Sequence, residues 1–239
     1  MMLAVGPTRE GAKLITSCLA APAHHSHVSE TGDEMDTRAH WEKVFATKQS
    51  TEVSWYQAIP VRSIELLRDA GANPNTAIID VGGGDSTLVD SVVSGQLGHI
   101  TVLDISAAAL ARARARLGSQ ASEVTWLRAD VTRVDLPKRA FDVWHDRAVF
   151  HFLTTPIERA QYVASARSSL RQGGFLLVAT FAANGPTRCS GLEVARYSID
   201  ALEAEFGDGF ALRRNFTDVH LTPSGSEQQF TVAMFERMT

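Results

Sequence analysis

The sequence has little cysteine, no long apolar run and no excess of basic residues. Two cysteines, Cys18 and Cys189, stand far apart in a chain of 239 residues. They predict neither a disulfide framework nor a zinc knuckle, so a reducing, cytoplasmic location is expected. No apolar run approaches the roughly 18 residues of a membrane span, so no membrane association is expected. The formal net charge is −4, whereas nucleic-acid-binding domains usually carry a basic face, so no nucleic-acid partner is expected.

The first 35 residues differ in pattern from the rest. Gly, Pro, Ser and His are scattered there without period, and we interpret residues 1–35 as a disordered tail, with Met35 as an alternative start. Thr16, Ser17 and Pro22 interrupt the apolar core that a secretory signal needs. A transit peptide is disfavoured because strong bases are few. The histidines of the tail lack acidic or cysteine neighbours, so no metal site is expected.

From residue 36 to 239 the pattern is that of one α/β domain. It begins with a helical cap over 36–75, and strands and helices then alternate, which predicts βαβ units and a parallel sheet. The last two predicted strands have no helix between them, so they must pair as an antiparallel hairpin. Helices are predicted over 37–45, 61–71, 86–95, 106–118, 155–173 and 198–207, and strands over 76–81, 99–104, 123–130, 141–147, 175–182, 210–221 and 228–238.

Acidic residues end the first three strands of the predicted sheet, where ligands of such sheets bind. Asp80 precedes Gly82 and Gly84, whose bare backbone permits close approach of a ligand. A dinucleotide fingerprint would need a third glycine at Thr87, and a carboxylate at Asp80 would repel a pyrophosphate. Asp80 is instead suited to an ammonium group, Asp104 to the hydroxyls of a ribose and Asp130 to the amine of an adenine. This combination indicates S-adenosylmethionine as the cofactor.

Four ordered stretches resemble the successive motifs of the class I S-adenosylmethionine-dependent methyltransferases. They are IIDVGGGDST (78–87), VLDIS (102–106), LRAD (127–130) and FDVWHDRAVFHFL (141–153), within a resemblance that covers about residues 38 to 238. The resemblance implies a Rossmann-like, seven-stranded sheet in the order 3-2-1-4-5-7-6. It places Asp80, Gly82 and Gly84 at the methionine part of the cofactor and Asp104 at the ribose. Ile105 then lies beside the adenine, and Asp130 and Val131 at its edge. Ser86 stands where the family has its usual third glycine.

The acceptor is expected at the end of the fourth strand. Asp146 and Arg147 are predicted to approach it, with His151 as the candidate general base and His145 on the cofactor side. The stretch WHDRAVF is similar to the W-D-R-G/A pattern of thiopurine-type methyltransferases, which methylate small thiols. It also occupies the place of the D-K-G-T-F-D pattern of some protein-lysine methyltransferases. The final acid of that pattern is replaced by His151 in this sequence.

Two loops are expected to close over the site. The loop over 52–57 carries Trp55, predicted to cover the cofactor, and Tyr56, predicted to face the substrate. The loop over 184–197 follows the fifth strand, a position where long loops are usually functional. Three of its residues are predicted to contact the substrate: Arg188, Arg196 and Tyr197. Cys189 is interpreted as a small buried thiol.

These patterns favour a methyltransferase that acts on a small molecule, a thiol or another soft nucleophile. The expected partner is therefore a small-molecule methyl acceptor, and the oligomeric state is left open. Two alternatives remain at this point: a protein-lysine methyltransferase, and a module that binds S-adenosylmethionine without catalysis.

Overall fold

A seven-stranded sheet forms the centre of the molecule in the computed structural model, which describes residues 31–238. The strand order is β3-β2-β1-β4-β5-β9-β8. Because β8 and β9 are the sixth and seventh predicted strands, this is the predicted order, and the prediction is confirmed. β1 to β5 run parallel, and β9 pairs antiparallel with both β5 and β8. The strands are β1 (Ala77–Val81), β2 (His99–Asp104), β3 (Thr125–Arg128), β4 (Phe141–Arg147), β5 (Leu170–Phe181), β8 (Phe210–Leu221) and β9 (Glu227–Arg237).

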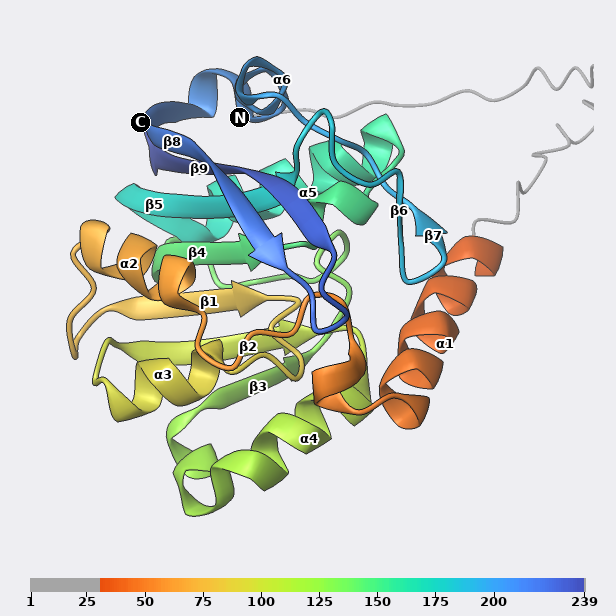
Figure 1. The fold of residues 1–239 in the computed structure, drawn as a ribbon. Coiled ribbons are helices and arrows are strands. Elements are labelled where there is room, and N and C mark those ends of the chain that lie inside the picture. Colours follow the sequence, from red (N-terminus) through yellow and green to blue (C-terminus); the bar gives the residue numbers. More distant parts are fainter. Residues whose placement is uncertain (1–30, 239) are drawn as a thin grey trace, which may run out of the picture.

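Helices cover both faces of the sheet, and one helix stands apart from them. The apolar sides of α2, α3 and α4 pack on one face, and those of α5 and α6 pack on the other. Figure 1 shows α1 beyond the edge where the parallel strands end. The helices are α1 (Thr31–Thr47), α2 (Val61–Asp69), α3 (Leu88–Ser94), α4 (Ala107–Leu117), α5 (Pro156–Ser169) and α6 (Ile199–Phe206). Short 3-10 turns lie at Ser50–Glu52 (η1), Gly118–Glu123 (η2), Phe150–Phe152 (η3) and Gly207–Gly209 (η4).

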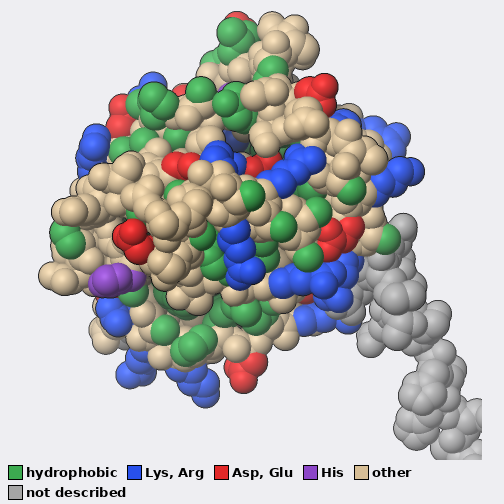
Figure 2. All heavy atoms as spheres, turned by 90° about the horizontal axis from the view of Figure 1, so that it is seen from below, with side chains coloured by type: hydrophobic (Ala, Val, Ile, Leu, Met, Phe, Trp, Pro, Cys, Tyr) green, Lys and Arg blue, Asp and Glu red, His purple; other side chains and the backbone are tan. Residues whose placement is uncertain are grey.

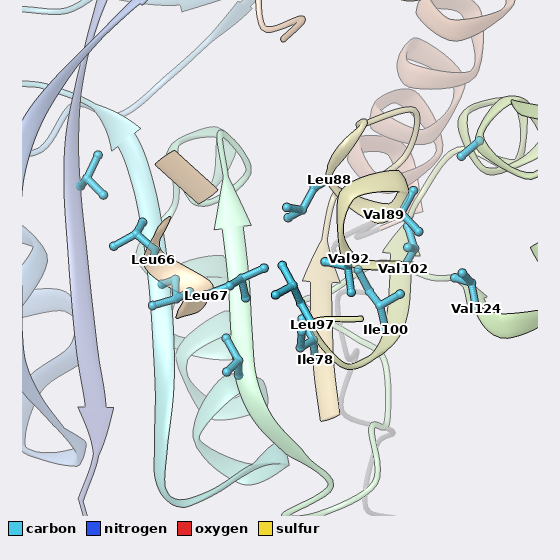
Figure 3. Packing of buried hydrophobic residues seen from close by; sticks show 14 of the residues in the cluster. Leu66, Leu67, Ile78, Leu88, Val89, Val92, Leu97, Ile100, Val102 and Val124 are labelled. Atoms are coloured by element: carbon cyan, nitrogen blue, oxygen red, sulfur yellow. The ribbon is translucent and has the colours of Figure 1, made fainter. Parts of the chain in front are cut away.

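The core on the first face is built from aliphatic side chains of strands and helices that alternate along the chain. Figure 3 shows Leu66 and Leu67 of α2, Ile78 of β1, and Leu88 and Val92 of α3 in this layer. All of them are buried. Such burial stabilises by roughly 1.5–3 kcal/mol per large aliphatic side chain, so this layer fixes the position of β1 and of the loop that follows it.

Side-chain caps hold the start of three helices. The side chain of Ser106 accepts from the backbone N–H of Ala109, and Ser198 caps α6 in the same way. Thr155 and Glu158 form a capping box at the start of α5, whose first residue is Pro156. These contacts satisfy N–H groups that have no partner within the helix.

Several element boundaries differ from the predictions. α5 ends at Ser169 instead of Gly173, because Leu170 is extended and fully buried and pairs with Phe141 at the start of the sheet. Gly173, with φ 74°, lies within the first residues of β5. α1 begins at Thr31 rather than at residue 37. The predicted loop over 184–197 contains a small hairpin, β6 (Arg188–Cys189) and β7 (Leu192–Glu193). The tail predicted over 1–35 lies, for residues 1–30, outside the described part of the chain.

The surface around α4 mixes both signs of charge. Figure 2 shows Lys and Arg side chains interspersed with Asp and Glu on the lower side of the molecule. Arg112 and Arg116 of α4 both lie within ion-pair distance of Asp85, and Arg116 also contacts Asp90. Two of the three arginines of this helix therefore pair with acids of the neighbouring loop and of α3, and the third, Arg114, lies over the ring of Trp126. Across residues 31–238 no helix is both long and apolar enough to traverse a bilayer.

Candidate functional site

The glycine loop turns between the end of β1 and α3, and its neighbours leave no room for side chains. Gly82 has φ 65°, and a Cβ there would collide with Val149, which follows β4. Gly84 has φ 30°, and a Cβ there would collide with the carboxylate of Asp104. Glycine is therefore required at both positions for backbone conformation and for close contact with the neighbouring strand ends.

Asp80 is buried at the end of β1, and the protein binds only one of its two oxygens. Its Oδ1 lies 2.7 Å from Nδ1 of His145, and Nε2 of that histidine lies 2.9 Å from Oγ of Ser63 in α2. Oδ2 is buried and has no hydrogen-bond partner among the described residues. The predicted cofactor residue His145 thus stands behind Asp80. Ser63 was missed because nothing in the helical pattern of α2 marks it as more than a buried small residue.

Asp104 ends β2 and is 5% exposed. Its Oδ1 accepts from the backbone N–H of Ser106 at 2.8 Å. Burial raises the pKa of Asp104 to about 7, the hydrogen bond from Ser106 opposes this, and the nearby charges of Asp80 and Glu42 add to it. Asp104 therefore changes charge near neutral pH.

Asp130 follows β3 and organises its own turn. Its Oδ1 accepts from the backbone N–H of Thr132 at 2.9 Å and from the hydroxyl of the same residue at 2.8 Å. Val131, the next residue, is buried in the apolar cluster on the sheet face that α5 and α6 cover. Thr132 and Arg133 also line the site, and neither residue was predicted from the sequence.

A cavity of about 440 Å³ joins these strand ends. The predicted cofactor residues Gly82, Asp104, Ile105, Asp130 and Val131 line one side of it. The opposite side is formed by α1, by the start of α5 and by the β6–β7 hairpin. The wall residues from these elements include Thr37, Trp41, Phe45, Thr155, Glu158, Gln161, Cys189, Leu192 and Glu193.

Four aromatic side chains form one wall of the large cavity. The ring of Trp41 lies 5.0 Å from that of Phe152 and 5.9 Å from that of Trp55, in edge-to-face contact. Phe45 lies 6.2 Å from both tryptophans. Of these only Trp55 was predicted as a site residue. The others were missed because Trp41 and Phe45 fit the apolar side of a helix and Phe152 fits a packing motif.

The structure separates two of the three predicted catalytic residues from the cavity. Asp146 points to the opposite face of the sheet, where Oδ1 accepts from Val149 N–H at 2.9 Å and Oδ2 from Phe150 N–H at 3.0 Å. The hydroxyl of Tyr162 donates to the same Oδ2 at 2.6 Å. Burial raises the pKa of Asp146 to about 6 against these hydrogen bonds. Its carboxylate is therefore used to hold the turn after β4.

His151 is fully buried, and its Nδ1 accepts from the backbone N–H of Phe181 at 3.3 Å. Burial and the nearby charge of Arg147 lower the pKa of His151 to about 3. The surrounding rings of Phe152 and Phe181 leave the charged form of His151 without solvation, which disfavours the expected uptake of a proton near neutral pH.

Arg147, in contrast, does line the cavity. Its Nη1 donates to the backbone oxygen of Trp55 at 3.0 Å, and its guanidinium lies 5.1 Å from the ring centre of Phe230. Nη2 is buried and has no hydrogen-bond partner among the described residues. Burial lowers the pKa of Arg147 to about 10, so the side chain is still protonated at neutral pH.

The predicted substrate residues are dispersed. Tyr56 lines a smaller pocket of about 60 Å³ around Asp80, next to the large cavity. Arg188 and Arg196 are exposed and donate to backbone oxygens of their own loop. Tyr197 packs at 5.4 Å from Phe150 on the other face of the sheet, and burial raises its pKa to about 12. None of these four residues lines the large cavity.

Cys189 is the residue of the 184–197 loop that is both buried and at the cavity. Burial raises the pKa of its thiol to about 11, although a hydrogen bond with Ser54 and the charges of Lys48 and Arg147 oppose the shift. The thiol is protonated at neutral pH, and the interpretation of Cys189 as a buried thiol is confirmed.

The residues at the strand ends fit S-adenosylmethionine. The unpartnered Oδ2 of Asp80 can accept from an ammonium group, and Asp104 retains an oxygen for ribose hydroxyls. Ile105 and Val131 provide apolar surface beside Asp130 for an adenine ring. The residues 37–238, whose side chains are described, hold no cluster of His, Cys, Asp and Glu suited to a metal ion.

Comparison with known proteins gives consistent relatives. The family model for a methyltransferase domain matches residues 78–174. A mouse protein, eEF1A lysine and N-terminal methyltransferase, is 24% identical over 129 residues, which are 54% of this chain and 18% of that protein. The chain thus spans less than a fifth of the length of this curated relative.

Two solved structures have a similar fold across most of the chain. One comes from work on the conversion of a disulfide bond into a thioacetal group during echinomycin biosynthesis, with a TM-score of 0.68, 17% identity and coverage of 84% of this chain and 93% of that one. The other is the Burkholderia thailandensis 1,6-didemethyltoxoflavin-N1-methyltransferase, solved with its substrate and S-adenosylhomocysteine, with a TM-score of 0.60, 17% identity and 94% coverage of both chains. Residues 78–174 thus match a methyltransferase domain, and the sheet order and the strand-end acids agree with the class I S-adenosylmethionine-dependent methyltransferase fold.

Proposed function

We propose that this protein transfers a methyl group from S-adenosylmethionine to a small molecule bound in the large cavity. The observation that carries the proposal is the aromatic wall of that cavity, formed by Trp41, Phe45, Trp55 and Phe152. Beyond the cofactor acids the cavity extends between Trp41 and Phe45 of α1 on one side and Leu192 of the β6–β7 hairpin on the other. A chamber with apolar and aromatic walls is the common form of a small-molecule site, whereas a protein substrate needs an open groove.

The proposed catalysis is alignment with exclusion of water. The cofactor supplies an electrophilic methyl group on a sulfonium, and the chain must hold an acceptor atom in line with it. Trp55 and Arg147 close the inner side of the chamber, since Arg147 fixes the backbone of Trp55. The aromatic wall keeps water from the reacting atoms. The protein then acts mainly by positioning the acceptor and not by transferring a proton.

A soft nucleophile, a thiol above all, is the acceptor class we propose. Neither Asp146 nor the candidate base His151 lines the cavity, so an acceptor that is partly ionised at neutral pH needs least help. The structural relative from the thioacetal work comes from a study of chemistry at sulfur. The Burkholderia relative, by its name, methylates a ring nitrogen of a small molecule.

Methylation of a protein lysine is the second candidate. It is supported by the name of the mouse relative, which matches over half of this chain. Glu158 and Glu193 at the cavity also provide negative charge that a lysine amine would favour. The aromatic wall of the cavity favours a small acceptor over a lysine, because apolar and aromatic walls are the common form of a small-molecule site.

A transfer assay with methyl-labelled S-adenosylmethionine tests the proposal. Cell extract is separated into a fraction of small molecules and a fraction of proteins, and each is incubated with the purified protein. We expect label in the small-molecule fraction, and a Trp41→Ala variant should lower kcat/KM for that acceptor because it removes a wall of the chamber. Label confined to protein would support the lysine alternative. No label in either fraction, with intact cofactor binding, would favour a non-catalytic binding module.

A further inference from the structure

Three polar side chains share one face of the sheet at the ends of β1 and β4. Asp80 is paired in register with His145, and Val81 with Asp146, so Arg147 follows directly beside Gly82. Because side chains alternate along a strand, Asp80, His145 and Arg147 point to one face and Asp146 to the other. Asp80, Gly82 and Arg147 line the same pocket of about 60 Å³, which adjoins the large cavity at Trp55 and Gly82.

Asp80 and Arg147 each have one side-chain atom that is hydrogen-bonded to the protein and one that has no hydrogen-bond partner among the described residues. His145, itself bonded to Ser63, fixes Oδ1 of Asp80, and the carbonyl of Trp55 fixes Nη1 of Arg147. Oδ2 of Asp80 and Nη2 of Arg147 are both buried and have no partner in the described chain. No ion pair joins the two side chains within residues 37–238. Buried donors and acceptors are rarely left unpaired, so this pocket is suited to a ligand that carries both charges.

We propose that Asp80 and Arg147 together bind the amino-acid end of the cofactor. Asp80 accepts from the ammonium group, and Nη2 of Arg147 donates to the carboxylate. Ser63 and His145 act as positioning residues, because they fix Oδ1 of Asp80 and leave Oδ2 toward the glycine loop. Arg147 then recognises the cofactor, whereas the sequence analysis placed it at the acceptor. This inference rests on the proposed function only for the identity of the cofactor.

The charge of Arg147 argues against a purely structural role. A guanidinium that only packed on Phe230 would be buried without an anion, which is unfavourable. Asp218 on β8 contributes a favourable charge, but its carboxylate pairs with Arg62 at 3.1 Å. The other source for the missing anion is an acidic group on the acceptor, and the experiment separates the two.

Calorimetric titration with two ligands tests the assignment. One ligand is S-adenosylmethionine, and the other is decarboxylated S-adenosylmethionine, which lacks only the carboxylate. The wild-type protein should bind the first more tightly by about 10- to 100-fold, the range of a charge-assisted hydrogen bond. In Arg147→Ala this ratio of dissociation constants should fall to near one, and Arg147→Lys should retain part of it. Arg213→Ala, which removes a charge on β8 that pairs with Glu236, is the matched control and should keep the full ratio.

The ratio is insensitive to a general loss of structure, because a loosened Trp55 segment weakens both ligands equally. An unchanged ratio in Arg147→Ala would overturn the inference while the proposed function stands, and Arg147 would return to the acceptor. A wild-type protein that binds neither ligand would overturn both. If the ratio of dissociation constants falls to near one in Arg147→Ala but the wild-type protein transfers methyl groups to neither fraction, this assignment stands and the proposed function is refuted.

Discussion

Replacing Asp104 by asparagine should stabilise the protein without cofactor at pH 8 and weaken cofactor binding at the same pH. The carboxyl of Asp104 is buried, and burial raises its pKa from 3.8 to about 7. The folded protein therefore binds this proton more readily than the unfolded chain does. The contribution of the protonated group to stability is fully present below pH 3.8 and is lost as the pH rises to about 7.

The size of the effect follows from the two pKa values. A difference of about three pKa units corresponds to about 4 kcal/mol of lost stability above pH 7, and roughly 2 to 3 kcal/mol of it develops between pH 5 and pH 8. In Asp104→Asn the amide oxygen would still accept from Ser106 N–H, so this contact at the start of α4 is kept. For a domain of this size, each 1 kcal/mol of stability shifts the midpoint of thermal unfolding by roughly 2–4 °C. The variant should thus melt several degrees above the wild type at pH 8 and near the wild type at pH 4.

Thermal melts of both proteins between pH 4 and pH 8, without and with saturating S-adenosylmethionine, measure this. The ligand should raise the midpoint of the wild type more than that of Asp104→Asn, because the neutral amide holds the ribose hydroxyls less well. The weakening should be about 1.5–3 kcal/mol, as for hydrogen bonds to a charged group. A difference between the two melts that does not change with pH would refute the argument that Asp104 is held at a raised pKa. Unchanged cofactor affinity would remove Asp104 from the ribose.

Two further predictions concern residues outside the cavity. Tyr162→Phe should lower the free energy of unfolding by about 2–3 kcal/mol, because it leaves the buried Oδ2 of Asp146 and Nε1 of Trp144 without their hydroxyl partner. Denaturant melts measure this loss, and calorimetry should show that the variant binds the cofactor with normal affinity. His151→Asn should leave the pH dependence of kcat/KM near neutrality unchanged, since the pKa of His151 is lowered to about 3; a profile that flattens in the variant would make His151 a base after all.

The fold was predictable because the local signals agree. Apolar strands that alternate with capped helices leave little choice of topology, and the absence of a helix before residues 228–238 fixes the final hairpin. The end of α5 was misjudged for an identifiable reason. Gly173 is a common helix terminator, but Leu170 gains more by joining the sheet beside Phe141, and the glycine instead serves a turn within β5.

The cofactor side of the site was largely predictable and the acceptor side was not. Residues that end neighbouring parallel strands meet at one edge, so Asp80, Asp104 and Asp130 could be brought together from their positions alone. The joint assignment of Asp146 and Arg147 conflicted with the two-residue period of a strand, which sends them to opposite faces. The aromatic wall depends on how α1 packs across the sheet edge, and no local pattern encodes that packing.

The packing of α1 is linked to the cofactor acids through a single residue. Ser106 donates its backbone N–H to Asp104 at 2.8 Å and its hydroxyl to Glu42 of α1 at 2.9 Å. Glu42 also accepts from the first backbone N–H groups of α4, at Ala107 and Ala108, where a carboxylate is favoured. Because α1 carries Trp41 and Phe45 at the cavity, Ser106 connects the carboxylate predicted to bind the ribose with the helix that supplies part of the aromatic wall.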